Sequence, residues 1–232
     1  MTPTFYRAAA VASIISAVTT VILIFAPQFY AAVPDGLPGR VHRVVDPAYQ
    51  MRAWTYLLHP FVAGFAALAV AIAIRRFAPV LALVAALGFL LWAFTEAAQQ
   101  CLTLFAFDDW RRAWLVGDPI VRETMELRIA IYDGLWEAAY SLLLFGIIIG
   151  SAALAAALLR MSDGLSRAVG GLFVLASLQS ILLQSAELGG PALPDSLAYW
   201  IYPATQPLAR LLIGLWLLRV ARNGEFRVGA PA

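Results

Sequence analysis

The sequence contains no lysine, because all 16 of its basic residues are arginine. A lysine amine forms the Schiff base of retinal and pyridoxal proteins and contacts the phosphates bound by a P-loop, so these three chemistries are excluded. Cysteine is almost as scarce. Cys101 is the only one, which excludes an intrachain disulfide and a cluster of thiolate ligands. We therefore expect no cofactor.

Histidine is limited to His42 and His59. The spacings typical of metal sites, Glu-x-x-His and His-x-x-x-His, do not occur, and no histidine pair within the membrane is left for haem. His59 together with Glu96, Asp133 and Glu137 has the ligand types of a hard or borderline divalent ion. Without a matching motif, however, we predict no metal site.

Charged residues are also few, at 13% of the chain against about 25% in soluble domains. Hydrophobic residues make up 62% of the sequence and the mean hydropathy is +0.80. This composition predicts an all-α polytopic membrane bundle, in which the lipid bilayer is the first partner. Nucleic acid is not expected as a partner, because the net charge of +2 is small and the arginines are dispersed.

We predict a single membrane domain over residues 1–232 with six transmembrane helices. The approximate spans are 8–30, 52–75, 78–107, 128–159, 164–188 and 196–220. Six spans place both termini on the same side of the membrane. Arginines in the very short loops on that side, such as Arg75 and Arg76, favour cytoplasmic termini in a bacterial inner membrane.

Aspartate followed by proline marks two helix starts, at 46–47 and 118–119, because aspartate caps a helix and proline suits its first turn. The second start predicts a helix that begins outside the membrane and runs unbroken to Arg160. Asp195 is expected to cap the last helix. The polar segment 108–128, which mixes tryptophan with arginine, is expected to lie at the membrane interface.

Polar side chains recur at helical spacing in the predicted spans, so that each set shares one helix face. We predict that these faces meet in a pocket in the outer half of the membrane, closed inward by the apolar runs 143–149 and 211–218. The candidate ligand-binding residues are His59, Glu96, Gln99, Gln100, Asp133, Glu137, Gln184, Glu187, Gln206 and Arg210. Antiparallel neighbours should bring Glu96 and Glu137 to a similar depth.

The predicted pocket contains four carboxylates and a single arginine at membrane depth, Arg210. Four neighbouring acids cannot all be ionised, because like charges repel and burial penalises charge. We expect Arg210 to pair with Glu187 or Glu137, while the remaining acids hold protons or a cationic ligand.

Several features resemble a family of uncharacterised bacterial six-helix membrane proteins, of the domain-of-unknown-function type. They are the end of the second helix at Arg75-Arg76, the intramembrane Glu96, the entry Leu165-Ser166-Arg167, and Pro207, Gly214, Leu215, Trp216, Leu217 and Leu218 in the last helix. That family has an acid in the last helix where this chain has Arg210. The resemblance implies the architecture and no activity.

Three functions remain open. The first is binding or transport of a small cationic or amphipathic molecule, or of protons, through the carboxylate-rich pocket. Six spans are few for a transporter acting alone, so a homodimer is one expectation. The second is an intramembrane enzyme acting on a lipid-like substrate, with Glu96 and Glu137 as the catalytic acid and base. The third is an accessory subunit whose polar faces dock onto a larger membrane complex.

Overall fold

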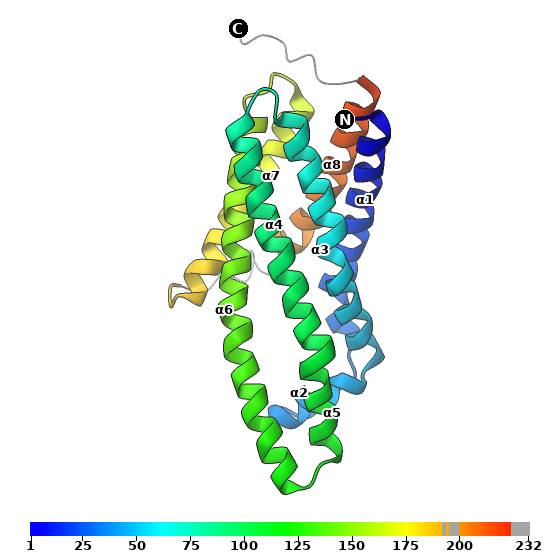
Figure 1. Cartoon of the computed structure of the whole chain (residues 1–232), viewed down its shortest axis with the longest axis vertical. Helices are drawn as coiled ribbons and strands as arrows, with labels where there is room; N and C mark the ends of the chain where they lie inside the picture. Colours follow the sequence, from blue (N-terminus) through cyan, green and yellow to red (C-terminus); the bar gives the residue numbers. More distant parts are fainter. Residues whose placement is uncertain (192–193, 195–199, 224–232) are drawn as a thin grey trace.

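The computed structural model describes residues 1–191, 194 and 200–223 (Figure 1), and all regular structure in these residues is helical. The long helices are α1 (Pro3–Phe25), α3 (Pro47–Ile74), α4 (Pro79–Leu102), α6 (Pro119–Leu158), α7 (Gly164–Glu187) and α8 (Tyr202–Asn223). The short elements are α2 (Leu37–His42), α5 (Asp108–Val116), the 3-10 turns η1 (Ala26–Phe29) and η2 (Arg43–Val45), and the π-helical turn η3 (Thr103–Phe107). The predicted all-α bundle is confirmed.

Five segments of the described chain are long and apolar enough to cross a membrane. They are Pro3–Phe29, Pro47–Ile74, Pro79–Val116, Pro119–Leu158 and Gly164–Glu187. The first two begin at 3 and 47 rather than at the predicted 8 and 52. The arginine-bearing α8 is not among the five. The coarser prediction, a bundle with several helices of membrane-spanning length, is therefore what the structure shows.

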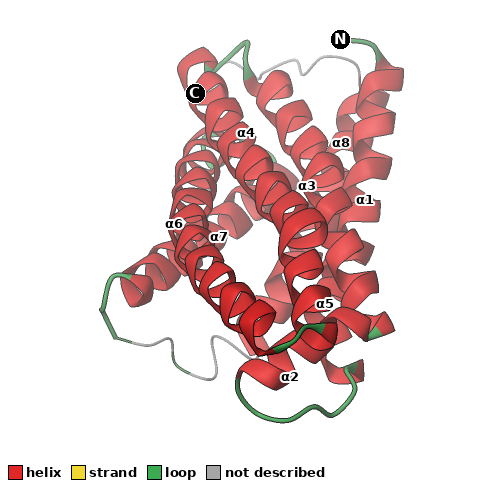
Figure 2. Ribbon diagram, turned by 60° about the horizontal axis from the view of Figure 1, so that its bottom comes forward, coloured by secondary structure: helices red, strands yellow, loops and turns green. Residues whose placement is uncertain are grey.

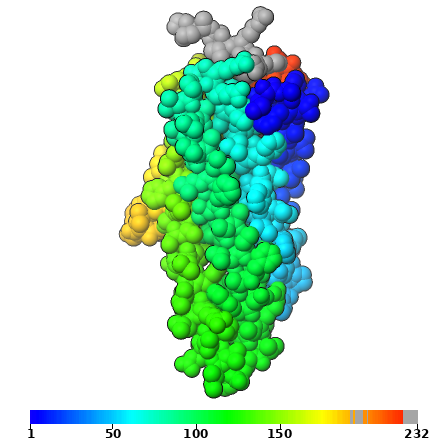
Figure 3. All heavy atoms as spheres, in the orientation of Figure 1, coloured from blue at the N-terminus to red at the C-terminus, as the bar shows by residue number. Residues whose placement is uncertain are grey.

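The long helices form a closed ring. Each packs on the next in the order α1, α3, α4, α6, α7, α8, and α8 returns to α1 (Figure 2). Helix α8 runs antiparallel to α1, and the Ser13 hydroxyl donates to the Arg210 carbonyl at 2.6 Å. The hairpin of α5 and the first part of α6 extends past the end of α1, as the green spheres in the lower part of Figure 3 show. Helix α2 lies at this end (Figure 1), which we call the α2 end.

Three aspartates cap the helices that the sequence predicted. Asp46, Asp118 and Asp163 each accept a hydrogen bond from a backbone N–H in the first turn of α3, α6 and α7, respectively. The prediction of one long helix from residue 119 to about Arg160 is confirmed, because α6 ends at Leu158. The predicted cap at Asp195 lies outside the described residues.

The polar segment 108–128 is almost entirely helical. Helix α4 continues through η3 into α5, and only two residues separate the end of α5 from the start of α6. At the π-helical turn the Thr103 hydroxyl bonds both the Gln99 carbonyl and the Tyr132 hydroxyl. This side-chain bond to the neighbouring helix holds the irregular turn, so that the chain leaves the bundle as a helical hairpin rather than a loop.

Helices α4 and α6 approach closely because glycines face each other between them. A Cβ atom on Gly88 would lie 2.5 Å from the Gly150 nitrogen, and one on Gly146 would lie 2.7 Å from the Trp92 nitrogen. Small residues allow such backbone contact between membrane helices. The packing fixes the α4–α6 pair as one wall of the ring.

The end of the bundle opposite α2, which we call the closed end, has a compact core. Trp216, Leu217 and Leu158 are fully buried there. The Trp216 indole donates to the Ser166 hydroxyl at 2.8 Å, and that hydroxyl donates to Asp163 at 2.6 Å. Arg219 completes the chain with an ion pair to Asp163 at 2.9 Å. The start of α7 and the end of α8 are tied together by these bonds.

We predict that Gly88→Ala lowers the free energy of unfolding by about 1–3 kcal/mol, because its Cβ meets the backbone of α6 with no flexible side chain to move aside. The control is Gly134→Ala, where a Cβ would meet no atom within 4 Å. This variant should match the wild type or exceed its stability by up to about 1 kcal/mol. Unfolding in detergent measures both. Equal effects of the two substitutions would refute the close packing.

We also predict that Asp163→Asn lowers stability at pH 7 by up to about 1 kcal/mol, because the amide can still cap α7 but loses the ion pair with Arg219. Burial raises the pKa of Asp163, but hydrogen bonds from Ser166 and the nearby Arg219 guanidinium outweigh it, so the folded pKa is lowered. The ionised group therefore contributes stability that is complete above the unfolded pKa of about 3.9. This stability is lost as the pH falls through the folded value.

Thermal unfolding at pH 7 and in the acid range checks this prediction. The wild type should lose more of its midpoint temperature on acidification than Asp163→Asn does. Asp35→Asn, in an exposed loop, should keep the wild-type midpoint at pH 7. An unchanged acid dependence in Asp163→Asn would contradict the prediction.

Candidate functional site

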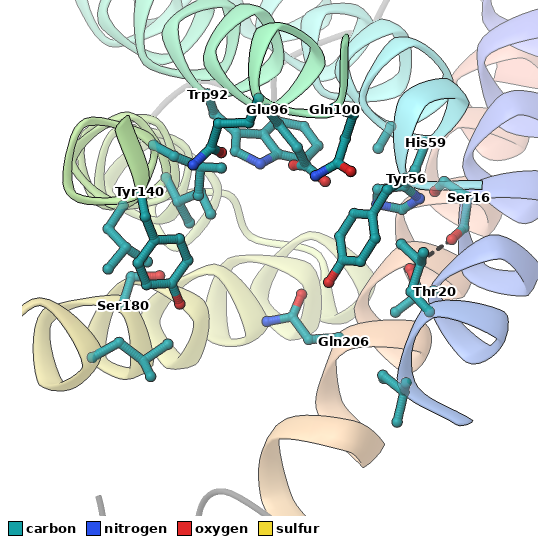
Figure 4. A pocket seen from close by; sticks show the side chains of 18 of the residues that line it. Ser16, Thr20, Tyr56, His59, Trp92, Glu96, Gln100, Tyr140, Ser180 and Gln206 are labelled. Atoms are coloured by element: carbon teal, nitrogen blue, oxygen red, sulfur yellow. Dashed lines mark hydrogen bonds between the residues drawn. The ribbon is translucent and has the colours of Figure 1, made fainter. Parts of the chain in front are cut away.

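The ring of helices encloses a cavity of about 1310 Å³, lined by residues of α1, α3, α4, α6, α7 and α8 and by Arg40 of α2. Figure 4 shows Tyr56 of α3, Glu96 and Gln100 of α4 and Gln206 of α8 directed toward a common space. The polar faces predicted from helical spacing thus turn toward the interior of the ring.

Nine of the ten predicted site residues line this cavity. They are His59, Glu96, Gln99, Gln100, Asp133, Glu137, Glu187, Gln206 and Arg210. The tenth, Gln184, is buried elsewhere, and its Oε1 atom has no hydrogen-bond partner in the described part of the chain. The face of α7 that lines the cavity contains Ser180, Leu183 and Glu187. Gln184 is the next residue after Leu183, so the helical rotation directs its side chain away from that face and toward the neighbouring helices.

Glu96 is the enclosed carboxylate of the site, with only 6% of its surface exposed. Trp92 and the Arg210 guanidinium are its interacting neighbours. The Arg210 guanidinium carbon lies 5.9 Å from the centre of the Trp92 ring. A buried acid, a guanidinium and an aromatic face therefore meet at one place in the cavity wall.

His59 lies next to this group and is equally enclosed, with 3% of its surface exposed. Its Nδ1 atom is 2.7 Å from the Thr19 hydroxyl, and its ring meets the edge of Trp92 at 6.2 Å. The hydrogen bond to α1 fixes the orientation of the imidazole. His59 is held by packing and by Thr19 on the side of the cavity opposite α6 and α7.

The other three acids do not surround Arg210 as a buried cluster. Asp133 forms an ion pair with Arg40 at 2.6 Å, and both groups are partly exposed. Glu137 and Glu187 are exposed residues at the edge of the cavity. The expectation of four crowded carboxylates is thus wrong for Asp133, because α2 supplies its own arginine. The pairing of Arg210 with Glu187 or Glu137 stays a prediction.

The relative depth of Glu96 and Glu137 follows from the register of α4 and α6. The Gln99 amide donates to the Trp136 carbonyl at 3.0 Å, one turn from the Thr103–Tyr132 contact. Glu96 therefore lies opposite residue 139, within about 5 Å of Glu137 along the helix axis. The two carboxylates lie at a similar depth in the bundle, as expected for antiparallel neighbours.

Two arginines of the cavity were missing from the predicted site, Arg40 and Arg52. The Arg52 Nε atom donates to the Leu23 carbonyl at 2.9 Å, and the guanidinium also bonds the hydroxyls of Tyr56 and Tyr30. The helical spacing of Arg52, Tyr56 and His59 was the available signal for Arg52. Nothing in the local sequence around Arg40 indicated its ion pair with α6.

The cavity reaches farther toward the closed end than predicted. The apolar run 143–149 lines it instead of closing it, and the cavity continues to Ser151 and Ile213. Closure occurs at the fully buried Trp216 and Leu217. Small lining residues leave this room between the helices. They are Ala63, Ala66, Ala67 and Ala176.

At the α2 end the segment around α2 lies across the bundle. Val41 is fully buried in a cluster with Phe107 of η3 and with Ile129 and Tyr132 of α6. The Phe107 and Tyr132 rings are stacked at 4.1 Å. Together with the Arg40–Asp133 ion pair, this cluster holds α2 against the hairpin and covers this end of the cavity.

A buried ionic cluster next to α2 was also missed by the sequence reasoning. Asp108 is fully buried and its carboxylate accepts bonds from Tyr49, Gln50 and Arg111. Arg111 also donates to the Tyr49 hydroxyl at 2.7 Å and lies over the Phe107 ring at 4.1 Å. This cluster joins the start of α3 to α5, so it fixes the α2 end of the bundle.

Among the described residues, no three His, Cys, Asp or Glu side chains are grouped as ligands for a metal ion. No family model, no curated protein and no solved structure matches this chain. The resemblance to uncharacterised six-helix bacterial proteins stays a prediction. The geometry of the cavity is therefore the basis for inferring a function.

We predict that Asp108→Asn lowers the free energy of unfolding by about 3 kcal/mol or more, because it leaves the Arg111 charge buried without its carboxylate. The matched control is the adjacent Asp109→Asn. Asp109 pairs with Arg112 at the same helical spacing, but both side chains are half exposed or more. This variant should cost less than about 1 kcal/mol. Chemical unfolding in detergent compares them, and similar losses would contradict the assignment.

Proposed function

We propose that this chain is an integral membrane protein that binds or transports a small cationic or amphipathic molecule, or protons, in the cavity around Glu96. The observation that carries the proposal is the enclosed Glu96 carboxylate at the wall of a cavity of about 1310 Å³. Placing a carboxylate among membrane helices costs free energy, so such a residue is a functional candidate by default. The cavity gives a ligand room to reach Glu96.

The charge of the lining supports a cationic or amphipathic ligand. Four carboxylates line the cavity, Asp133 among them, against the three guanidinium groups of Arg40, Arg52 and Arg210. Acidic groups therefore outnumber basic groups in the lining. The inward direction of the polar faces (Figure 4) also favours a ligand inside the ring over docking of these faces onto a partner subunit.

The proposal includes six spans with both termini on the cytoplasmic side of a bacterial inner membrane. Helix α8 has 22 residues and is therefore about 33 Å long, close to the roughly 30 Å of a hydrocarbon core. Its antiparallel packing along α1 supports a sixth span. Arg75, Arg76 and Arg160 lie in the short connections at the closed end, and Arg167 lies in the first turn of α7, which supports a cytoplasmic closed end.

An acid–base enzyme acting on a lipid-like substrate is the second candidate. The observation that favours it is the contrast between two carboxylates at similar depth, Glu96 enclosed and Glu137 exposed. Acid–base catalysis uses two carboxyl groups that lie in different environments. Mass analysis of a co-purified ligand before and after incubation with the protein distinguishes the two candidates, because an enzyme changes the mass of the ligand and a binding protein does not.

We predict that tetraphenylphosphonium, an amphipathic cation, binds the purified protein and changes its tryptophan fluorescence, because Trp92 and Trp136 line the cavity. Glu96→Gln should weaken this binding about tenfold or more, as expected when a charged partner worth about 1.5–3 kcal/mol is removed. Fluorescence titration in detergent measures the affinity.

The matched control is Glu123→Gln, an exposed position of α6 that does not line the cavity. It should bind tetraphenylphosphonium like the wild type. Equal affinities of the wild type and a folded Glu96→Gln would show that the enclosed carboxylate is not the binding group. Native mass spectrometry of the wild type identifies any ligand that co-purifies.

A further inference from the structure

The cavity changes from polar to apolar along the bundle axis. Toward the α2 end its lining includes Arg52, Tyr56, Glu96, Gln100 and Asp133, which we call the polar belt. Toward the closed end the lining is mostly apolar, apart from the small hydroxyls of Ser13 and Ser151. The apolar lining includes Phe89, Ile147, Val169, Phe173 and Ile213. A molecule that fills the whole space must therefore carry a polar group at one end and a hydrocarbon portion at the other.

The cavity opens on one side of the ring. The residues that line the cavity and are also exposed surround this side opening. They are Phe25, Gln28, Arg40, Glu137, Glu187, Trp200 and Ala204. They belong to α1, η1, α2, α6, α7 and the start of the α8 segment. Lining residues of α3 and α4 are all buried or half-buried, so the opposite wall is closed.

The course of α7 explains the opening. Its C-terminal end stands away from the ring in Figures 1 and 2. Helices α7 and α8 are joined at the closed end by the Asp163–Arg219 ion pair and farther along by the contact between Gln179 and Thr205. Beyond Thr205 the two helices separate, and Leu183 and Ala204 face the cavity between them.

The side opening lies at the level of a lipid leaflet. Ala204 is 15 residues from Arg219, about 22 Å along the helix, and Glu137 is 21 residues from Leu158, about 31 Å. With a hydrocarbon core of about 30 Å that begins at the closed end, the opening lies between the acyl chains and the head groups of the other leaflet. At the α2 end the buried Val41 holds α2 against the bundle, which narrows the direct path from water.

We propose that the ligand is a membrane lipid that enters sideways through this opening, with its head group at the polar belt and its acyl chain toward Phe173. This inference rests on the proposed function and names its ligand class. The polar belt lies at head-group depth and the apolar lining at acyl-chain depth, so a lipid of that leaflet moves in without turning over. The volume of about 1310 Å³ exceeds the roughly 300–1,000 Å³ of pockets for small molecules.

The test uses phosphatidylcholine with a diazirine near the end of its acyl chain, in phosphatidylcholine vesicles containing the full-length protein. After illumination, peptide mass spectrometry locates the label. We expect labelling at cavity positions such as Ile147 and Phe173, in addition to the exposed Leu87 of the outer surface. Labelling confined to exposed positions would overturn the proposal.

Narrowing the opening tests the path. Ala204→Trp should lose the label at Ile147 and Phe173 while keeping it at Leu87. Ala138→Trp is the control, because Ala138 is exposed on α6 and does not line the cavity. It should label like the wild type. Leu183→Trp narrows the opening from α7 and replaces Ala204→Trp if that variant does not fold. Cavity labelling that persists in a folded narrowed variant would refute lateral entry.

The two proposals fail in different ways. If tetraphenylphosphonium binds through Glu96 but the lipid never labels the cavity, the proposed function holds and the lipid assignment is wrong. If the lipid labels the cavity but Glu96→Gln does not change the affinity for tetraphenylphosphonium, the lipid assignment holds and the proposed role of the carboxylate is wrong.

Discussion

A carboxyl group enclosed in a bundle with an apolar outer surface must be solvated by the protein or by what the protein binds. Glu96 is in this position, and the arrangement around it follows from that constraint. Arg210 reaches it from α8 and Trp92 flanks it on α4, while His59 is held nearby from α3. Apolar side chains packed tightly against Glu96 would leave its charge unsolvated, so the helices surround a cavity at this level.

The cavity depends on an uneven ring. On one side, α4 and α6 touch backbone to backbone through Gly88, Gly146 and Gly150, which makes a rigid wall. On the other side, α7 and α8 are joined mainly near the closed end, through Asp163 and Trp216. Close packing all round the ring would leave no space at Glu96. The cavity therefore depends on the weak contact between α7 and α8, which leaves the space that the close contact between α4 and α6 does not.

The parts of the fold that were predictable are those with local causes. An aspartate cap acts within one turn, so the starts of α3 and α6 could be predicted directly from Asp46 and Asp118. Helical spacing likewise indicated which polar residues share a face. It could not resolve the rotation of a helix within the ring to better than about one residue. For this reason Gln184 was assigned to the cavity, although it is buried outside its lining.

The contacts that escaped prediction join segments far apart in the sequence. The Arg40–Asp133 ion pair and the cluster of Tyr49, Asp108 and Arg111 both depend on how α2 and α5 fold back onto the bundle. Their local sequence resembles ordinary interfacial segments, because tryptophan, arginine and aspartate are common there. The depth of the cavity could not be predicted for the same reason, because it depends on how alanines of different helices face each other.

The absence of lysine, an observation of composition, acquires a structural meaning at the α2 end. Arg43 lies over Tyr30, Arg52 over Tyr56 and Arg111 over Phe107, with the guanidinium carbon 4.1–4.9 Å from each ring centre. A planar guanidinium stacks on a ring and still donates sideways to oxygen atoms, as Arg52 does to the Leu23 carbonyl. An ammonium group lacks this planar fork of donors, so it cannot reproduce the same combination of stacking and sideways hydrogen bonds. Arginine therefore suits the boundary between the apolar outer surface of the bundle and its polar cavity.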